Sequence, residues 1–114
     1  MKQPLKKDQA FLDEVNQTAE KKDGFRLWWL GQSGFLLQWN QKHALIDPYL
    51  SDSLTRKYAN TDKPHVRMTE RVVAPEKLSF VNLITSSHNH TDHLDAETII
   101  PIMERNPKVT IIVP

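Results

Sequence analysis

Four potential metal ligands fall within six consecutive residues, namely His88, His90, Asp92 and His93. His88 and His90 stand two apart after an apolar run, so in extended backbone their imidazoles share one face and can bind one divalent cation. Asp92 and His93 follow where the chain bends, so they can face a second cation. Two neighbouring cations that share a water lower its pKa and contact both the attacking and the leaving oxygen of a hydrolysis reaction. The spacing therefore predicts a metal site, and it makes two adjacent cations that share a water sterically reasonable, an arrangement suited to hydrolysis.

The remaining composition restricts the choice of ligands and metals. The sequence has no cysteine, so a metal site must use histidine or carboxylate side chains. His43 and His65 stand alone in turn-like and loop-like sequence, and we expect neither to bind metal. Zn²⁺ and Mn²⁺ both suit His and Asp ligands, so we predict two divalent ions of either kind.

The elements around this motif are expected to form a βαβ unit. Residues 81–85 are apolar and β-branched, as in a buried strand, and they lead directly into the motif. A helix follows; because Pro101 is tolerated only in a first turn, Thr98 is a better N-cap than Asp95, though one turn could precede it. Residues 109–113 form a second buried strand, which gives a right-handed crossover connection.

The N-terminal half has a different pattern. Residues 1–24 contain apolar side chains at helical spacing and end at Gly24, which predicts an amphipathic helix. Residues 25–30, 35–39 and 44–46 are short apolar runs separated by turn-like sequence, as in a three-stranded antiparallel meander. Trp28 and Trp29 point to opposite faces of the first strand. A long connection spans residues 47–78, with one helical turn near residues 54–58.

Charge and hydropathy exclude several classes of function. Fifteen basic residues balance fourteen acidic ones, so no concentrated basic surface indicates nucleic-acid binding. No segment approaches the roughly 20 apolar residues of a membrane span, and no apolar signal core is present, from which we expect a cytoplasmic protein. A small molecule is the expected partner.

The motif resembles the signature of the metallo-β-lactamase superfamily. Three flanking segments are similar to the branch that contains L-ascorbate-6-phosphate lactonases: Trp28-Trp29-Leu30-Gly31-Gln32-Ser33-Gly34-Phe35, Leu45-Ile46-Asp47-Pro48-Tyr49-Leu50, and Leu83-Ile84-Thr85. The resemblance covers residues 25–114. It implies an α/β fold, the αββα sandwich, of which residues 1–114 would form the N-terminal half, with the helix in 1–24 and the sheet and ligand motif in 25–114.

The resemblance also assigns roles to residues. His88 and His90 would bind the first cation, and Asp92 and His93 the second. Asp92 and Asp47 are the candidate catalytic residues: Asp92 would help hold a hydroxide that bridges the metals, and Asp47 would orient a ligating histidine. An aspartate before a proline could equally be a turn former.

A lactone such as L-ascorbate 6-phosphate, or a related ester, is the substrate that the branch implies. A phosphodiester is the alternative within the same fold. The substrate would be anionic or phosphorylated, and although Arg71 could border its pocket, we expect Arg71 to be solvated. A homo-oligomer is a further expectation.

A different class of function also fits this sequence. In the superfamily, a further His, a bridging Asp and a final His come from later loops. We therefore expect the chain to be a portion of a longer protein, truncated and inactive by itself. Because half a sandwich would expose apolar sheet positions among Trp28, Trp29, Val81, Leu83 and Ile111, we expect it to aggregate or pair.

Overall fold

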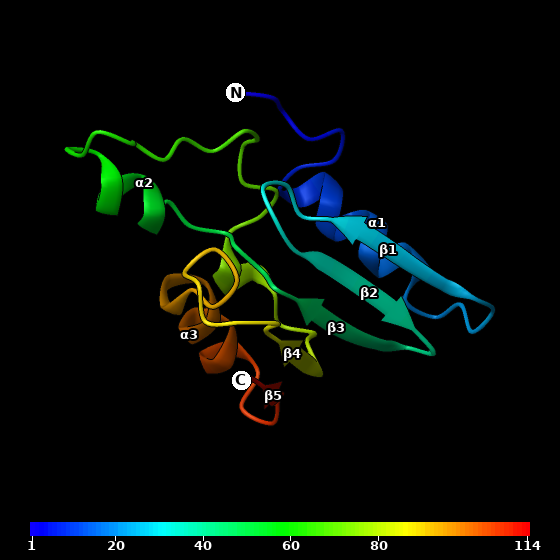
Figure 1. Cartoon of the computed structure of the whole chain (residues 1–114). Coiled ribbons are helices and arrows are strands. Elements are labelled where there is room, and N and C mark those ends of the chain that lie inside the picture. The colour runs from blue at the N-terminus through cyan, green and yellow to red at the C-terminus, as the bar shows by residue number, and fades with distance from the viewer.

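A single five-stranded mixed sheet organises the chain (Figure 1). The computed structural model describes residues 1–114, the whole sequence. In chain order the elements are α1 (Gln9–Thr18), β1 (Phe25–Trp29), β2 (Phe35–Trp39), β3 (Lys42–Ile46), α2 (Ser53–Tyr58), the 3₁₀ helix η1 (Pro75–Lys77), β4 (Leu83–Thr85), α3 (Ala96–Arg105) and β5 (Thr110–Ile112). The strands lie side by side in sequence order.

The predicted meander and βαβ unit are both confirmed, but the second strand of the unit, β5, was expected to be buried and is largely exposed, because it lies at the edge of the sheet. β1, β2 and β3 pair antiparallel, whereas β4 pairs parallel with β3 and β5 pairs parallel with β4. The turn between β2 and β3 consists of Asn40 and Gln41, both with positive φ (48° and 62°), as a two-residue hairpin turn requires. This tight turn makes β3 begin at Lys42, two residues earlier than expected, so His43 is a strand residue and not a turn residue.

The two longest helices, α1 and α3, pack on the same face of the sheet. On that face Trp28, Leu36, Leu45, Ile84 and Ile111 stand in one row across the five strands. α1 contributes Phe11 and Val15 to the core, and α3 contributes Ile99 and Ile102. The Trp28 indole N–H also donates to the Glu14 carboxylate over 2.9 Å, which fixes α1 against the edge strand β1.

The first helix is shorter than its periodicity predicted. Lys2 lies in an extended segment, in which its N–H donates to Met68 O and its carbonyl accepts from Glu70 N, so the helix begins only at Gln9. It ends at Thr18, and Gly24 (φ 66°) belongs to the turn before β1. The expectation that Gly24 terminates the helix was therefore wrong.

α3 begins one turn before the preferred N-cap Thr98, at the alternative start that the sequence allowed. Asp95 is the N-cap, and its carboxylate accepts from Glu97 N. Pro101 consequently lies inside the helix rather than in its first turn. Its missing N–H deprives Glu97 O of a helical partner. The Thr98 hydroxyl donates to the Asp95 carboxylate and accepts from Leu50 N, so Thr98 is a buried link between α3 and the chain after β3.

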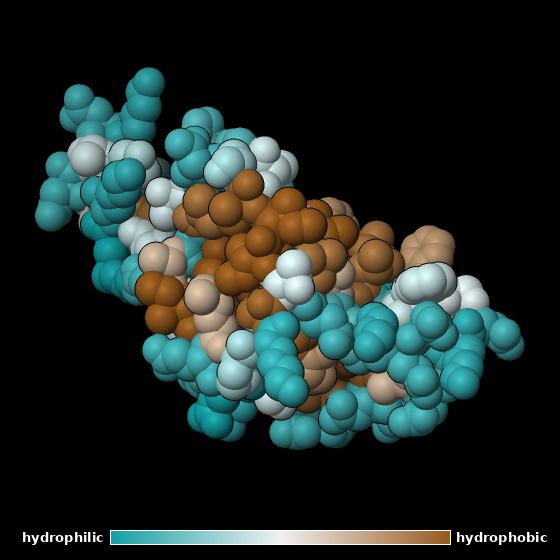
Figure 2. All heavy atoms as spheres, turned by 90° about the horizontal axis from the view of Figure 1, so that it is seen from below, coloured by the Kyte–Doolittle hydropathy of each residue, from teal (hydrophilic) through white to brown (hydrophobic).

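The second face of the sheet is uncovered. Phe25, Leu27, Trp29, Phe35, Trp39 and Ile112 are large, exposed hydrophobic side chains, and their positions in the ladders put them opposite the row of Trp28 and Leu36; we call them the open face. Viewed from below, hydrophobic side chains gather in a broad central area (Figure 2). Trp28 and Trp29 thus point to opposite faces as expected, with Trp28 on the covered face and Trp29 on the open face. Val81, one of the positions among which we expected exposure, is buried. None of the helices is long and apolar enough to cross a membrane.

Candidate metal centre

Two parallel strands end beside each other at the candidate site. β3 ends at Ile46 and β4 at Thr85, and these two residues are register partners. The chain segments that follow therefore leave the same edge of the sheet together. Asp47 N donates to Thr85 O over 2.9 Å, which extends the ladder by one bond. Asp47 and the residues after Thr85 are thus brought together by the topology, although about forty positions separate them.

Residues 86–93, the ligand loop, do not continue as an extended strand. They form bends followed by a turn, in which Leu94 N donates to His90 O over 2.8 Å. The buried Ser86 hydroxyl lies against the backbone carbonyls of His88 and His93 and so joins the two ends of the loop. The expectation of strand-like alternation at His88 and His90 was wrong, and it is the folded loop that gathers the imidazoles.

Asp47 occupies a conformation that suits its residue type. Its φ of 47° lies in the left-handed region, which aspartate tolerates better than most residues. Its carboxylate accepts hydrogen bonds from Ser87 N and the Ser87 hydroxyl, each over 2.6 Å, and from His93 Nδ1 over 2.8 Å. Burial raises the pKa of Asp47, but the hydrogen bonds from Ser87 and His93 outweigh burial and hold that pKa below its usual value of 3.8.

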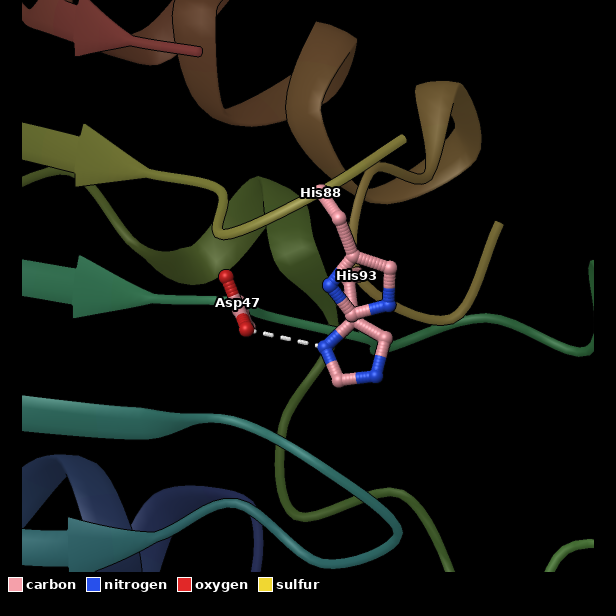
Figure 3. A group of neighbouring side chains, drawn as sticks. All are labelled: Asp47, His88 and His93. Carbon is pink, nitrogen blue, oxygen red and sulfur yellow. Dashed lines mark hydrogen bonds and ion pairs between the residues drawn. The ribbon is translucent and has the colours of Figure 1, made fainter. Parts of the chain in front are cut away.

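The three histidines of the ligand loop lie next to one another. The ring of His88 is 4.1 Å from that of His93 and 4.7 Å from that of His90, measured between centroids. Asp47, His88 and His93 each offer one ligand atom within 4.8 Å of the other two. Figure 3 shows the Asp47 carboxylate directed at the His93 ring, with the His88 ring beside it.

The donor atoms fit a divalent cation. His93 Nε2 and Asp92 Oδ2 are 3.5 Å apart. Two ligand atoms on a tetrahedral zinc ion lie about 3.3 Å from each other, given bonds of about 2.0–2.1 Å. Since His93 Nδ1 is engaged with Asp47, only Nε2 remains for a metal, and it faces the Asp92 carboxylate. The spacing of this pair is therefore close to that of two ligand atoms on one cation.

The four predicted ligands are brought together unevenly. His88 and His93 belong to the tight group with Asp47, whereas His90 and Asp92 lie at its margin. His90 contacts the group through its ring beside His88, and Asp92 through His93. The Ser33 hydroxyl donates to Asp92 O over 2.8 Å, so the turn between β1 and β2 holds the second half of the ligand loop.

Asp95 holds the exit of the ligand loop. Its carboxylate is buried and accepts from the hydroxyls of Ser51 (2.6 Å), Ser53 (2.9 Å) and Thr98 (2.6 Å). These bonds connect the segment after Asp47 with the start of α3.

Three contributors to this region were missed or given no role in the sequence. Ser33 lies in turn-like sequence and Ser87 directly precedes the motif, and no role was predicted for either. Arg67 was not singled out, yet it is only 3% exposed, donates to Tyr49 O and Ser51 O, and lies 5.1 Å from the Tyr49 ring centroid. Serine next to a histidine motif was the one available signal, whereas nothing marked Arg67 in the sequence.

His43 and His65 are not among the residues whose ligand atoms cluster at the site. His43 is buried in β3, where its Nε2 lies 3.0 Å from Gln38 Nε2 and its ring packs edge-on against Phe80. His65 lies 3.4 Å from Gln32 Nε2. Arg71 is exposed, in agreement with the prediction that it is solvated.

Adjacent parallel strands of the mixed sheet deliver a carboxylate and a histidine-rich loop to one edge. This arrangement is that of a metal-binding α/β protein. The family model described as a beta-lactamase superfamily domain matches residues 26–112, most of the chain. This chain belongs to that superfamily, and the match together with the Asp47, His88 and His93 cluster indicates a metal-dependent hydrolase in general.

Proposed function

We propose that the ligand loop binds two divalent cations, Zn²⁺ or Mn²⁺, in a hydrolase that opens a lactone such as L-ascorbate 6-phosphate. The observation that carries the proposal is the hydrogen bond between Asp47 and His93 Nδ1, over 2.8 Å, which leaves Nε2 of His93 facing Asp92. A carboxylate behind a ligating histidine is a common arrangement in metal sites, where it fixes the ring and strengthens the ligand.

Each residue would have a distinct task. His88 and His90, whose rings are neighbours, would share one cation, and His93 with Asp92 would share the other. The Asp92 carboxylate would also hold and orient the attacking water, and Asp47 would act through His93 without touching the substrate. The cations, when bound, would lower the pKa of that water and polarise the carbonyl under attack.

The substrate class rests on the sequence segments around the site. Those segments resemble the lactonase branch, and the turn at Gly31–Gly34 and the strand end at Asp47 are the pieces that surround the ligand loop. An anionic or phosphorylated lactone is the substrate that we propose. A phosphodiester is the other outcome that the test below distinguishes.

The number of ligands limits what this chain can do alone. Catalytic zinc sites use three protein ligands and leave one position to water, so two such ions take about six ligands. The ligand loop offers four. We therefore expect these residues to bind cations without turnover, and we expect activity in a centre whose remaining ligands are supplied from outside them.

The test combines metal content with turnover. When the remaining ligands are supplied and the site is loaded with zinc or manganese, we expect the protein to hydrolyse a phosphorylated sugar-acid lactone. We expect His90→Ala to abolish this hydrolysis. His65→Ala is the matched control, because His65 is not one of the residues whose ligand atoms cluster at the site. Hydrolysis of bis(p-nitrophenyl) phosphate alone would identify a phosphodiesterase instead. Turnover that survives His90→Ala would refute the assigned ligands.

A further inference from the structure

We propose that Ser87 is a positioning residue that extends the hold of Asp47 to His88, so that one carboxylate sets the ring tautomer of a ligand at each of the two metal positions. The assignment of His88 and His93 to different cations rests on the proposed function above. The hydrogen-bond chain itself does not depend on that assignment.

The contacts form an unbroken chain from His93 to His88. His93 Nδ1 lies 2.8 Å from Asp47 Oδ2, and the Ser87 hydroxyl lies 2.6 Å from the same oxygen. The Ser87 hydroxyl also lies 2.8 Å from His88 Nδ1. Ser87 N donates to Asp47 Oδ1 over 2.6 Å, which holds the serine in place while its hydroxyl contacts both neighbours.

Counting protons decides the direction of each bond. An ionised carboxylate only accepts, and a serine hydroxyl has a single proton. The Ser87 proton must therefore go to Asp47, and His88 Nδ1 must be the donor toward Ser87. By the same reasoning His93 Nδ1 donates to Asp47. Both rings are then fixed as Nδ1–H tautomers, which leaves the lone pair of each Nε2 for a cation.

A role limited to turn formation would not need this arrangement. Ser87 is exposed, so its hydroxyl could be satisfied by water. Its partner Asp47 is forty residues away in sequence, and the backbone bond from Ser87 N alone would join the two segments. What the hydroxyl adds is the connection to His88, a ring that has no direct bond to Asp47 among the contacts of this site.

The inference predicts an asymmetry between two variants. Ser87→Ala removes the acceptor for His88 Nδ1 and leaves the bond between His93 and Asp47 intact. Asp47→Asn removes the carboxylate from both, and asparagine also tolerates the left-handed backbone at this position. Ser87→Thr keeps a hydroxyl and is the conservative rescue.

The primary experiment needs no metal. In the metal-free chain labelled with ¹⁵N-histidine, nitrogen chemical shifts at pH 8 report the tautomer of each ring, in solution or in a sedimented sample. We expect His88 and His93 as Nδ1–H tautomers in the wild type and in Ser87→Thr. Ser87→Ala should shift His88 alone toward the Nε2–H form, and Asp47→Asn should shift both rings. An Nε2–H form of His88 in the wild type, or no change in Ser87→Ala, would overturn the inference.

Metal binding provides the second measurement and separates the two proposals. In a Zn²⁺ titration, we expect Ser87→Ala to weaken one of two binding events by about 10–100-fold, the usual effect of removing a group that supports a ligand, and to leave the other within about twofold. Equal weakening of both events would contradict the inference. A wild type that binds no zinc would refute the proposed function, while the tautomer result would still decide the role of Ser87.

Discussion

Gly34, immediately before β2, lies directly against the backbone of Asp47. A Cβ built on Gly34 would stand 2.5 Å from Asp47 O and 3.0 Å from Pro48 Cα, and the glycine itself has a φ of 93°. No other residue fits between the first hairpin and the strand end that presents the Asp47 carboxylate. The glycine of a turn thus determines where a residue of the candidate metal centre can sit.

Gly34→Ala should therefore destabilise the protein and displace Asp47. Gly24→Ala is the matched control, because Gly24 also has a positive φ, 66°, but a Cβ there would meet nothing within 4 Å. Both variants bear the cost of a left-handed alanine, about 1–2 kcal/mol. Gly34→Ala should cost about 1–3 kcal/mol more, the usual range for forced overpacking. Equal unfolding free energies in urea for the two variants would contradict this prediction.

Asp95 should contribute more to stability than an ordinary helix cap. Asp95→Ala removes a cap and leaves the hydroxyls of Ser51 and Thr98 without their acceptor, so we expect a loss of about 2–4 kcal/mol in the free energy of unfolding. Asp52→Ala is the control, since Asp52 precedes α2 without a side-chain capping bond and is exposed. Its change should stay within about 0.5 kcal/mol. Urea denaturation of both variants measures the difference.

His43 should make the protein less stable in mild acid. Burial lowers the pKa of His43 below its usual 6.5, so the unfolded chain takes up a proton first as the pH falls. The contribution of neutral His43 to the free energy of unfolding is fully present above pH 6.5. Below that pH it decreases, by at most about 1.4 kcal/mol per pH unit, until His43 is protonated in the folded protein as well. His43→Gln cannot be protonated, and its thermal midpoint should fall less than that of the wild type between pH 7.5 and pH 5. Parallel curves for the two proteins would exclude this role.

The open face should drive self-association. Trp29 and Trp39 are 57% and 58% exposed and lie on the same face of neighbouring strands, where their burial would be favourable. We expect light scattering to show a dimer or larger species for the wild type, and a particle near 13.2 kDa for the double variant Trp29→Lys, Trp39→Lys.

Val66→Lys is the matched control for this experiment, because Val66 is exposed but lies outside the sheet. This variant should associate as the wild type does. A monomeric wild type that unfolds cooperatively would show that the open face is tolerated in water.

Local patterns in the sequence were sufficient to find the five strands but not the start of β3 or of α3. The alternation around Trp28 and Trp29 follows from the two-residue period of a strand, which no tertiary contact needs to supply. The N-cap of α3 could not be chosen in this way, because Asp95 is stabilised by Ser51 and Ser53 from a distant segment. Those contacts outweigh the cost of Pro101 inside the helix.

The candidate site could likewise be predicted only in part from the sequence. The types and spacing of His88, His90, Asp92 and His93 indicated metal chemistry without any structure. The roles of Ser87 and Ser33 depend on Asp47 and on the turn before β2, which are close only after the sheet has formed. Residues that act through a neighbour in space leave little trace in a single sequence.

Isothermal titration of the metal-free chain with Zn²⁺ tests the central claim most directly. We predict two bound ions per chain in the wild type, and the loss or weakening of a single binding event in each of two variants, His90→Ala and Asp92→Asn. His65→Ala should bind as the wild type does. No zinc binding by the wild type, or two unchanged events in both ligand variants, would contradict the assignment of this loop as a binuclear metal site.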